Sequence, residues 1–497
     1  MKVFKAFLYS LIVLLVLFST ASAAPRIQEP PEILYVKETG EPTNSCLSWE
    51  DACDLQTAIG KLPDQIWVAA GTYIPTTTGD REISFELESG LKIYGGFPAE
   101  GGTWEERDWE LYLTILSGDL NGDDGENFAS NEENSYHVLT ATDVNRLAKL
   151  DGFIITGGNA DESSPPHNNG GGMYNFNSNP ILTNLKFTGN FAYYHGSAMY
   201  NDQSSPALTH VRFVENMGSA MSNVNSSPTL IDVHFLKNNW NGMSNYESNP
   251  TLLEVTFIEN GPAGGMLNNN SSPTLTNVLF SANFSEINGG GMRNEGGNAI
   301  LTNVSFIANS AGKKGGGMYN LGNNTDPTLT NVTFSGNSAE NGGGIYNNYS
   351  ASTLINVTFF GNTSTGDGGG IYNWSPDINP TDLINTILWG NTPESDQIFV
   401  FGSISPVVTY SVIQGGCPTG ASCDVIITDD PLLGPLADNG GFTMTHALRA
   451  GSSAIDTGIC VTGVTTDQRG VKRPLGSGCD IGAYEYEPRI FLPLMIR

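Results

Sequence analysis

Apolar and polar residues alternate in short fragments from about residue 170 to residue 391, and the fragments recur nine times. One fragment is Gly-rich and ends in Met or Ile, with Asn two positions later; the other has the form Phe-x-x-Asn. In one unit the expected inward residues are Met266, Asn268, Leu275, Val278 and Phe280. Their period of two, interrupted by turn residues, predicts short β-strands. The Gly, Asn, Ser, Thr and Pro content excludes helical repeats, which need runs of good helix formers.

The spacing of the fragments predicts a solenoid. Successive anchors lie 22 to 27 residues apart, at Met173, Met199, Met221, Met243, Met266, Met292, Met318, Ile345 and Ile371. We expect an all-β, right-handed parallel β-helix with three short strands per coil, in which nine coils at about 4.8 Å span roughly 43 Å. Stacking would align the Phe residues at 187, 213, 235, 257, 280, 306, 334 and 359 in one column. The closing Asn residues at 190, 216, 238, 260, 283, 309, 337, 362 and 391 would form another, linked by amide hydrogen bonds.

The alternation of Gly-Gly-Gly-Met/Ile with Phe-x-x-Asn resembles the repeats of polymorphic outer-membrane proteins, secreted bacterial proteins of the pectin-lyase-like fold. The resemblance covers about 220 residues and implies a β-helix. Those proteins end in a membrane translocator for which the sequence leaves no room after its last motif. The resemblance therefore does not imply autotransport.

The flanking segments resemble secreted bacterial β-helix proteins that carry a C-terminal choice-of-anchor Q domain. In front, the motifs are Ser48-Trp49, 66–75 and 151–160; behind, they are 438–448 and 479–485. This resemblance implies delivery to the cell surface or medium and does not imply a reaction. The last nine residues, 489–497, are either a sorting signal or a strand laid on the last coil.

These patterns divide the chain into five segments. Residues 1–23 have the basic start, apolar run and Ala-x-Ala end of a secretory signal peptide. Residues 24–165 are expected to form irregular opening coils and a cap helix that begins at Ser48 as N-cap. The nine regular coils occupy 166–392, and the apolar tail occupies 489–497. Closing coils and the anchor-like domain occupy 393–488, which we expect to form a disulfide-bearing C-terminal cap. The tail is too short to cross a bilayer, so we expect no transmembrane segment once the signal is removed.

Six cysteines lie as sequence neighbours outside the repeats, and in an exported chain they predict three local disulfides. The expected pairs are Cys46 with Cys53, Cys417 with Cys423, and Cys460 with Cys479. The 22 basic and 51 acidic residues give a formal charge of −29. This balance argues against nucleic acid as a partner and suits an extracellular protein, which we expect to be a monomer.

A basic line is the best candidate for chemistry. Lys186, Arg212 and His234 occupy the same outward position in successive coils, with His210 nearby. We read this line either as a lyase site, as a strip that binds an acidic glycan, or as ordinary solvated side chains. Carboxylates do not recur as aligned pairs, apart from Asp232 and Glu254, and the motifs of polygalacturonases and pectate lyases are missing.

Two further sets are candidates for binding. The outward residues Tyr174, Tyr200, Tyr319, Tyr346 and Tyr372 either stack to stabilise the coils or form a platform for sugar rings. Asp119, Asn121 and Asp123 are spaced like the first ligands of a Ca²⁺ loop, although the twelfth position is Ser130. Ca²⁺ is the one cofactor that the sequence offers, and the alternative is an acidic surface turn.

Two classes of function remain open. A secreted or cell-surface β-helix that adheres to a glycan or a protein partner explains the repeats without a catalytic set, and it is the preferred hypothesis. The alternative is a polysaccharide lyase or glycoside hydrolase of the pectin-lyase-like fold that acts on an acidic polysaccharide.

Overall fold

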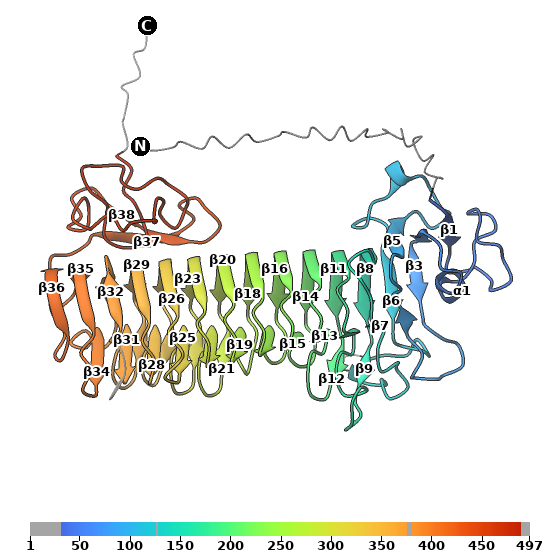
Figure 1. Ribbon diagram of the computed structural model, residues 1–497, viewed down its shortest axis with the longest axis horizontal. Coiled ribbons are helices and arrows are strands. Elements are labelled where there is room, and N and C mark those ends of the chain that lie inside the picture. Colours follow the sequence, from blue (N-terminus) through green and yellow to red (C-terminus); the bar gives the residue numbers. More distant parts are fainter. Residues whose placement is uncertain (1–30, 126–127, 375–379, 489–497) are drawn as a thin grey trace, which may run out of the picture.

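The structure is a computed structural model that describes residues 31–125, 128–374 and 380–488. The predicted signal peptide and the tail at 489–497 lie outside the described residues. The described part forms an all-β parallel solenoid of about 13 turns (Figure 1). The solenoid class predicted from the repeats is confirmed.

Two long sheets run along the solenoid. The first contains β1 (Ile33–Val36), β2 (Gln65–Ala69), β3 (Gly71–Tyr73), β5 (Lys92–Phe97), β6 (Thr114–Ser117), β8 (Lys149–Thr156), β11 (Ile181–Thr188), β14 (Ala207–Val214), β16 (Thr229–Leu236), β18 (Thr251–Ile258), β20 (Thr274–Ser281), β23 (Ile300–Ile307), β26 (Thr328–Ser335), β29 (Thr353–Phe360), β32 (Asp382–Ile384), β33 (Ile387–Trp389), β35 (Val407–Ile413) and β36 (Ser422–Ile427). The second contains β4 (Phe85–Glu86), β7 (Leu139–Thr142), β10 (Met173–Phe176), β13 (Met199–Asp202), β15 (Met221–Val224), β17 (Met243–Tyr246), β19 (Met266–Asn269), β22 (Met292–Glu295), β25 (Met318–Leu321), β28 (Ile345–Asn348), β31 (Ile371–Trp374) and β34 (Ile398–Phe401).

Short strands complete some of the turns between the long sheets. One pair is β9 (Asn159–Ala160) with β12 (Phe191–Ala192), and a row of four is β21 (Phe284–Ser285), β24 (Ser310–Ala311), β27 (Ser338–Ala339) and β30 (Thr363–Ser364). Elsewhere, β37 (Leu433–Ala437) pairs antiparallel with β38 (Thr445–Leu448). The helical elements of the described residues are α1 (Leu55–Gly60) and the 3₁₀ turn η1 (Trp104–Glu106).

Each eight-residue strand of the first sheet is bent once, at a residue with positive φ. In β20 this residue is Asn277, with φ of 54°, and it drops out of the register with the neighbouring strand. Asn adopts this left-handed conformation more readily than most residues because its short polar side chain bonds locally. The bend lets Leu275 and Val278, three positions apart, both point inward, where both are fully buried. The predicted inward residues are therefore confirmed, and two of the three expected strands are halves of one bent strand.

The two predicted columns are also confirmed. The Phe rings stack with centroids 4.7 to 5.1 Å apart. The closing Asn residues donate from Nδ2 to the Oδ1 of the next coil over 2.8 to 3.0 Å, from Asn190 to Asn391. The Asn that follows each anchor forms a second such ladder, from Asn175 to Asn373. The amides inside both ladders are thus bonded to their neighbours, and in the second ladder Asn175 Oδ1 and Asn373 Nδ2, at its two ends, have no partner among the described residues.

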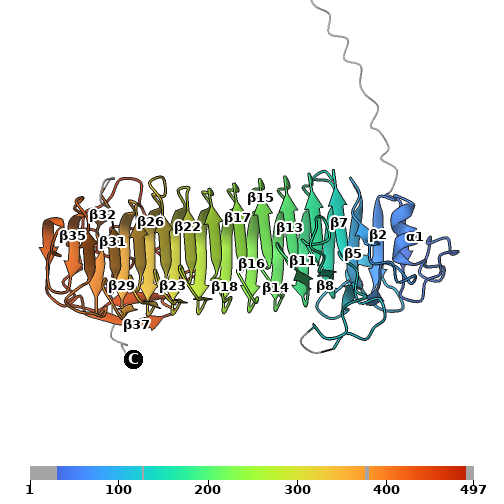
Figure 2. The same ribbon diagram turned by 90° about the horizontal axis from the view of Figure 1, so that it is seen from below.

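The N-terminal helix differs from the prediction in where it begins. It starts at Leu55, with Asp54 as N-cap accepting from the Thr57 N–H at 2.9 Å, and not at Ser48. A disulfide joins Cys53 to Cys46, and Cys53 pairs with Val36 of β1, so this segment is held extended. The helix buries Leu55, Ala58 and Ile59 at the N-terminal end of the solenoid (Figure 2).

The three predicted disulfides, Cys46–Cys53, Cys417–Cys423 and Cys460–Cys479, are all present. They indicate an oxidising compartment, as expected for an exported protein. Among the described residues, none of the helices is long and apolar enough to span a bilayer.

Residues 428–488, here called the C-terminal lobe, do not close the end of the solenoid as a cap would. They fold back along its side, above the strands near the C-terminal end of the first sheet (Figure 1). Gln468 of the lobe bonds Ser305 of β23 and Thr333 of β26, and Ala483 donates to Thr358 of β29. The lobe thus covers the outward position of three successive coils.

Candidate functional site

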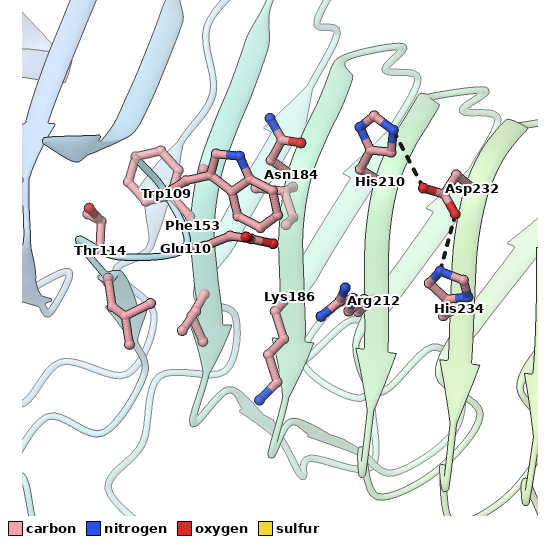
Figure 3. Close-up of a pocket in the computed structure, with 14 residues that line it drawn as sticks. Trp109, Glu110, Thr114, Phe153, Asn184, Lys186, His210, Arg212, Asp232 and His234 are labelled. Atoms are coloured by element: carbon pink, nitrogen blue, oxygen red, sulfur yellow. Dashed lines mark ion pairs between the residues drawn. The ribbon is translucent and has the colours of Figure 1, made fainter. Parts of the chain in front are cut away.

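A cleft of about 550 Å³ lies on the outer face of the first sheet, near its N-terminal end. It contains the whole predicted basic line and its histidine neighbour (Figure 3). The residues that line it are Trp109, Glu110, Leu113, Thr114, Gly152, Phe153, Ile154, Asn184, Leu185, Lys186, His210, Arg212, Asp232 and His234.

The bent strands place two columns of side chains along this cleft. Asn184, His210 and Asp232 occupy the positive-φ bend of β11, β14 and β16, with φ values of 52°, 54° and 52°. Two positions later, Lys186 pairs in register with Arg212, and Arg212 with His234. The predicted line is therefore continuous in space. The column at the bends lies beside it and adds the carboxylate of Asp232 and the imidazole of His210.

Asp232 lies between the two histidines of the cleft (Figure 3). Its Oδ1 is 3.2 Å from His234 Nε2 and its Oδ2 is 3.5 Å from His210 Nε2. The second ring nitrogen of His234, Nδ1, lies 2.8 Å from the Thr256 hydroxyl. Burial lowers the pKa of His234, with Asp232 opposing and Arg212 reinforcing the shift. His234 is accordingly neutral at pH 7, with both nitrogens engaged.

The cations of the cleft lack such partners. Within the described ranges, neither Lys186 nor Arg212 makes an ion pair or a side-chain hydrogen bond, and Arg212 is exposed. Most of the other arginines in the described ranges are paired; Arg107, for example, lies 2.6 Å from Asp151. In a chain with a net charge of −29, two unpaired cations side by side are available for an anionic ligand.

The wall at the N-terminal side is the segment of η1 and the residues after it, which contributes Trp109 and Glu110 (Figure 3). Arg107 anchors this segment because its guanidinium donates to the Gly95 carbonyl at 2.6 Å and to the Asp151 carboxylate. Burial alone would raise the pKa of Asp151, but the hydrogen bonds from Lys149 and Arg107 lower it. Asp151 therefore stays ionised and fixes the wall in place.

On the other side, the same face runs past β18 and β20 to the C-terminal lobe. The outward positions that follow the basic line are Thr256, Leu279, Ser305, Thr333 and Thr358. The last three are covered by the lobe, as described above. The open part of the face is thus bounded at both ends, and β11, β14 and β16 lie within it (Figure 1). These strands carry Lys186, Arg212 and His234.

The predicted tyrosines stack but are largely covered. Tyr346 and Tyr372 are parallel with centroids 4.4 Å apart, and Tyr174 lies 5.5 Å from Tyr200. Tyr200, Tyr319 and Tyr346 are buried, each less than 8% exposed. Lys314 lies over the Tyr346 ring at 4.7 Å. This burial favours the stabilising role over a sugar platform.

The predicted Ca²⁺ ligands are not brought together as a set. Asp119 lies instead with Asp124 and Glu133, with ligand atoms within 4.8 Å of one another. The Asp119 carboxylate accepts the backbone N–H groups of Gly122, Asp123 and Asp124. Burial is the largest cause that raises the pKa of Asp124 and of Glu133. Asn121 and Asp123 are exposed, and Asp123 lies beside Glu133, where it adds to the rise in the pKa of Glu133.

The sequence did not single out Trp109, Glu110 or Asn184. Trp109 reaches the cleft through an irregular loop, so no repeat position marks it. Asn184 lies in the same column as His210 and Asp232. In the sequence, His210 stands out as a neighbour of the basic line and Asp232 as one of two aligned carboxylates, but the column itself was not predicted.

Fold and cleft define the class of this protein as a parallel β-solenoid with a lateral cleft. A solved structure, a crystal structure of the pectate lyase Pel9A, resembles it with a TM-score of 0.40 and 12% sequence identity over 92% of this chain and 96% of that chain. No family model matches the sequence, and no curated protein matches it. The resemblances to outer-membrane repeats and to the anchor domain rest on their motifs alone.

Proposed function

We propose that this protein is exported and binds an acidic polysaccharide in the cleft. One observation carries the proposal: Lys186 and Arg212 lie unpaired and adjacent in one cleft, beside the ring of Trp109. Uronate carboxylates repeat along such a polymer, and Arg and Lys bind carboxylates by charge-assisted hydrogen bonds. An aromatic wall suits the apolar face of a sugar ring.

The finer features of the fold belong to the same proposal. We infer a right-handed coil, because connections between parallel strands of one sheet are almost always right-handed. We also infer that the C-terminal lobe serves display at the cell surface or release to the medium, as the anchor-domain resemblance implies.

The test is retention of the mature protein, from Ala24, in gels that contain pectate, alginate or chondroitin sulfate. We expect retention that falls at least tenfold in Lys186→Ala/Arg212→Ala and weakens with salt, because exposed charge pairs are screened. Arg146→Ala and Lys472→Ala remove the same two residue types at exposed positions outside the cleft and should leave retention unchanged. Equal retention of all variants would contradict the proposal.

A second candidate, a polysaccharide lyase, is favoured by Asp232 between His210 and His234. His210 is exposed, and among the described residues its Nδ1 has no hydrogen-bond partner while Nε2 faces Asp232. In an elimination, Nδ1 would take the proton next to a uronate carboxylate. The electron pair would form a carbon–carbon double bond, and the glycosidic C–O bond would break as the leaving oxygen takes a proton. Arg212 would neutralise the carboxylate.

Product assays separate the two functions. Unsaturated products that absorb in the ultraviolet, and that are no longer formed by His210→Ala, would identify the protein as a lyase. New reducing ends without such absorbance would indicate a hydrolase. Retention without either product would leave the binding function.

A further inference from the structure

The turn that follows the closing Asn differs in length among the coils. Nine positions separate Asn190 from Met199 and also Asn283 from Met292. Only five separate Asn216 from Met221 and Asn238 from Met243, and six separate Asn260 from Met266. Three consecutive coils are therefore short at the same place.

The short turns interrupt the third, narrow row of strands. β12 precedes them and β21 follows them, and the three short turns between carry no strand of this row (Figure 1). Right after the closing Asn, the backbone bonds to the coil before it. The backbone N–H of Met217 donates to the Asn190 carbonyl, and that of Asn239 donates to the Asn216 carbonyl. With β12 and β21 four coils apart, the gap is roughly 19 Å from strand to strand at about 4.8 Å per coil. We call this depression the notch.

Exposed aromatic rings gather at the N-terminal end of the notch. A cavity of about 350 Å³ there is lined by Phe191, Ala192, Tyr193, Tyr194, Met217, Gly218, Ser219, Asn239 and Trp240. Tyr193 and Tyr194 are each 57% exposed and Trp240 is 50% exposed. Across the notch, Phe284 and Ile287 are 44% and 50% exposed. Large exposed rings that cluster around one cavity indicate a binding site, whereas single apolar residues scattered over the surface do not.

The lining carries no charged side chain, in contrast to the basic cleft. Asn239 supplies an exposed amide, which makes a weak contact to the Met217 sulfur at 3.4 Å. The hydroxyl of Ser219 is buried and lies 3.2 Å from that of Ser244. Rings with a few amide and hydroxyl groups match a sugar, which has an apolar face of C–H groups and a rim of hydroxyls. A protein partner needs an interface of about 1,000 Å² or more, and the notch is only three coils wide.

We propose that the notch is a second carbohydrate site, which binds a neutral pyranose chain by stacking on Trp240 and on Tyr193 or Tyr194. It shares no lining residue with the cleft, so this inference stands independently of the acidic-polysaccharide site. Together the two sites would let one molecule hold two polymers of different charge.

The experiment is affinity electrophoresis of the full mature protein in gels with hydroxyethylcellulose, xyloglucan, glucomannan or dextran. We expect retention by at least one neutral polymer, and a loss of at least tenfold in Trp240→Ala and in Tyr193→Ala/Tyr194→Ala. Phe401→Ala removes another exposed aromatic ring, 56% exposed and outside the notch, and should change nothing. Lys186→Ala/Arg212→Ala should keep neutral retention.

Fluorescence gives a second readout. Oligosaccharides of the retained polymer should shift the emission of the native protein but not that of Trp240→Phe, because Trp240 is the indole in the notch. If none of the neutral polymers is retained, or if retention survives both sets of aromatic substitutions, the proposal is overturned.

Discussion

At the scale of the residue, the side chains that hold the coils together are amides. Asn283 is fully buried, donates to the Phe257 carbonyl at 2.8 Å and to Asn309 Oδ1 at 2.9 Å, and accepts from the backbone and side chain of Asn260 at 3.0 Å. These four hydrogen bonds use both N–H donors and both oxygen lone pairs of the amide. A buried network in which every group is paired is rigid, but each missing member leaves its neighbours unpaired.

Asn283→Ala should therefore lower the free energy of unfolding by about 3 kcal/mol, because several buried groups lose their partner. Denaturant unfolding followed by circular dichroism measures the change. Asn323→Ala, at an exposed turn, serves as control and should stay within about 0.5 kcal/mol of the native protein. A loss at Asn283 no larger than that of the control would contradict the role of the ladder.

A second residue links stability to pH. His137 is buried, its Nδ1 lies 3.0 Å from the Gly170 carbonyl, and its Nε2 has no partner among the described residues. Burial lowers the pKa of His137 to about 4. The folded state therefore binds this proton less readily than the unfolded chain does.

The stability that neutral His137 contributes should be present above about pH 6.5 and be lost as the pH falls from about 6.5 to 4, with a total of roughly 3 kcal/mol. Urea unfolding at a series of pH values tests this. His137→Gln, which keeps a donor for Gly170, should flatten the decline over this window. An unchanged slope in that variant would assign the pH dependence to other groups.

At the scale of the element, the contact between the lobe and the solenoid rests on polar side chains. Gln468 is buried; its Oε1 accepts from Thr333 at 2.7 Å, and its Nε2 donates to Ser305 and Thr443 at 2.7 and 2.8 Å. His446 adds a contact of 3.0 Å to Ser335. Removal of Gln468 would leave the buried hydroxyls of Thr333 and Thr443 without this partner. Ser305 would keep its bond to the Met444 carbonyl.

Gln468→Ala should therefore loosen the lobe while the coils stay folded. Limited proteolysis should cut residues 428–488 several-fold faster than in the native protein, with the solenoid surviving as the resistant fragment. Lys472→Ala, an exposed change in the same lobe, is the control. Equal cleavage rates in both variants would show that the apolar cluster of Ile387, Val412 and Ile481 holds the lobe without Gln468.

The sequence predicted the repeating elements, the three disulfides and a cap helix, but it misplaced the start of that helix and did not single out the loop that carries Trp109. Met, Phe and Asn recur at a fixed spacing, so their columns and the parallel pairing follow from stacking like on like. The helix at Leu55 and the loop that carries Trp109 occur once, and their positions depend on a disulfide and on the ion pair of Arg107 with Asp151. Contacts that occur only once leave no periodic pattern in the sequence.

At the scale of the whole molecule, two departures from regularity create the candidate sites. The lobe and the N-terminal loop leave only part of one face open, and the cleft lies there. The steps of 22, 22 and 23 residues among steps of mostly 26 are visible in the sequence, and the spacing from closing Asn to anchor assigns all three to the same turn. Only the structure shows that the short turns leave aromatic rings around a cavity. The basic line was predictable because its residues share one repeat position.

The lobe that lies across several coils also bears on how the molecule responds to tension. A bare solenoid pulled from its C-terminal end should unravel one coil at a time, each coil of about 26 residues releasing roughly 90 Å of chain. Here Asn385 of the solenoid bonds both the N–H and the carbonyl of Ile459, and Gln468 reaches coils further inward. In a single-molecule pulling experiment we expect one high-force rupture, when the lobe peels off, followed by a regular series of smaller steps. The lobe would thus raise the force that is needed to unfold the coils beneath it.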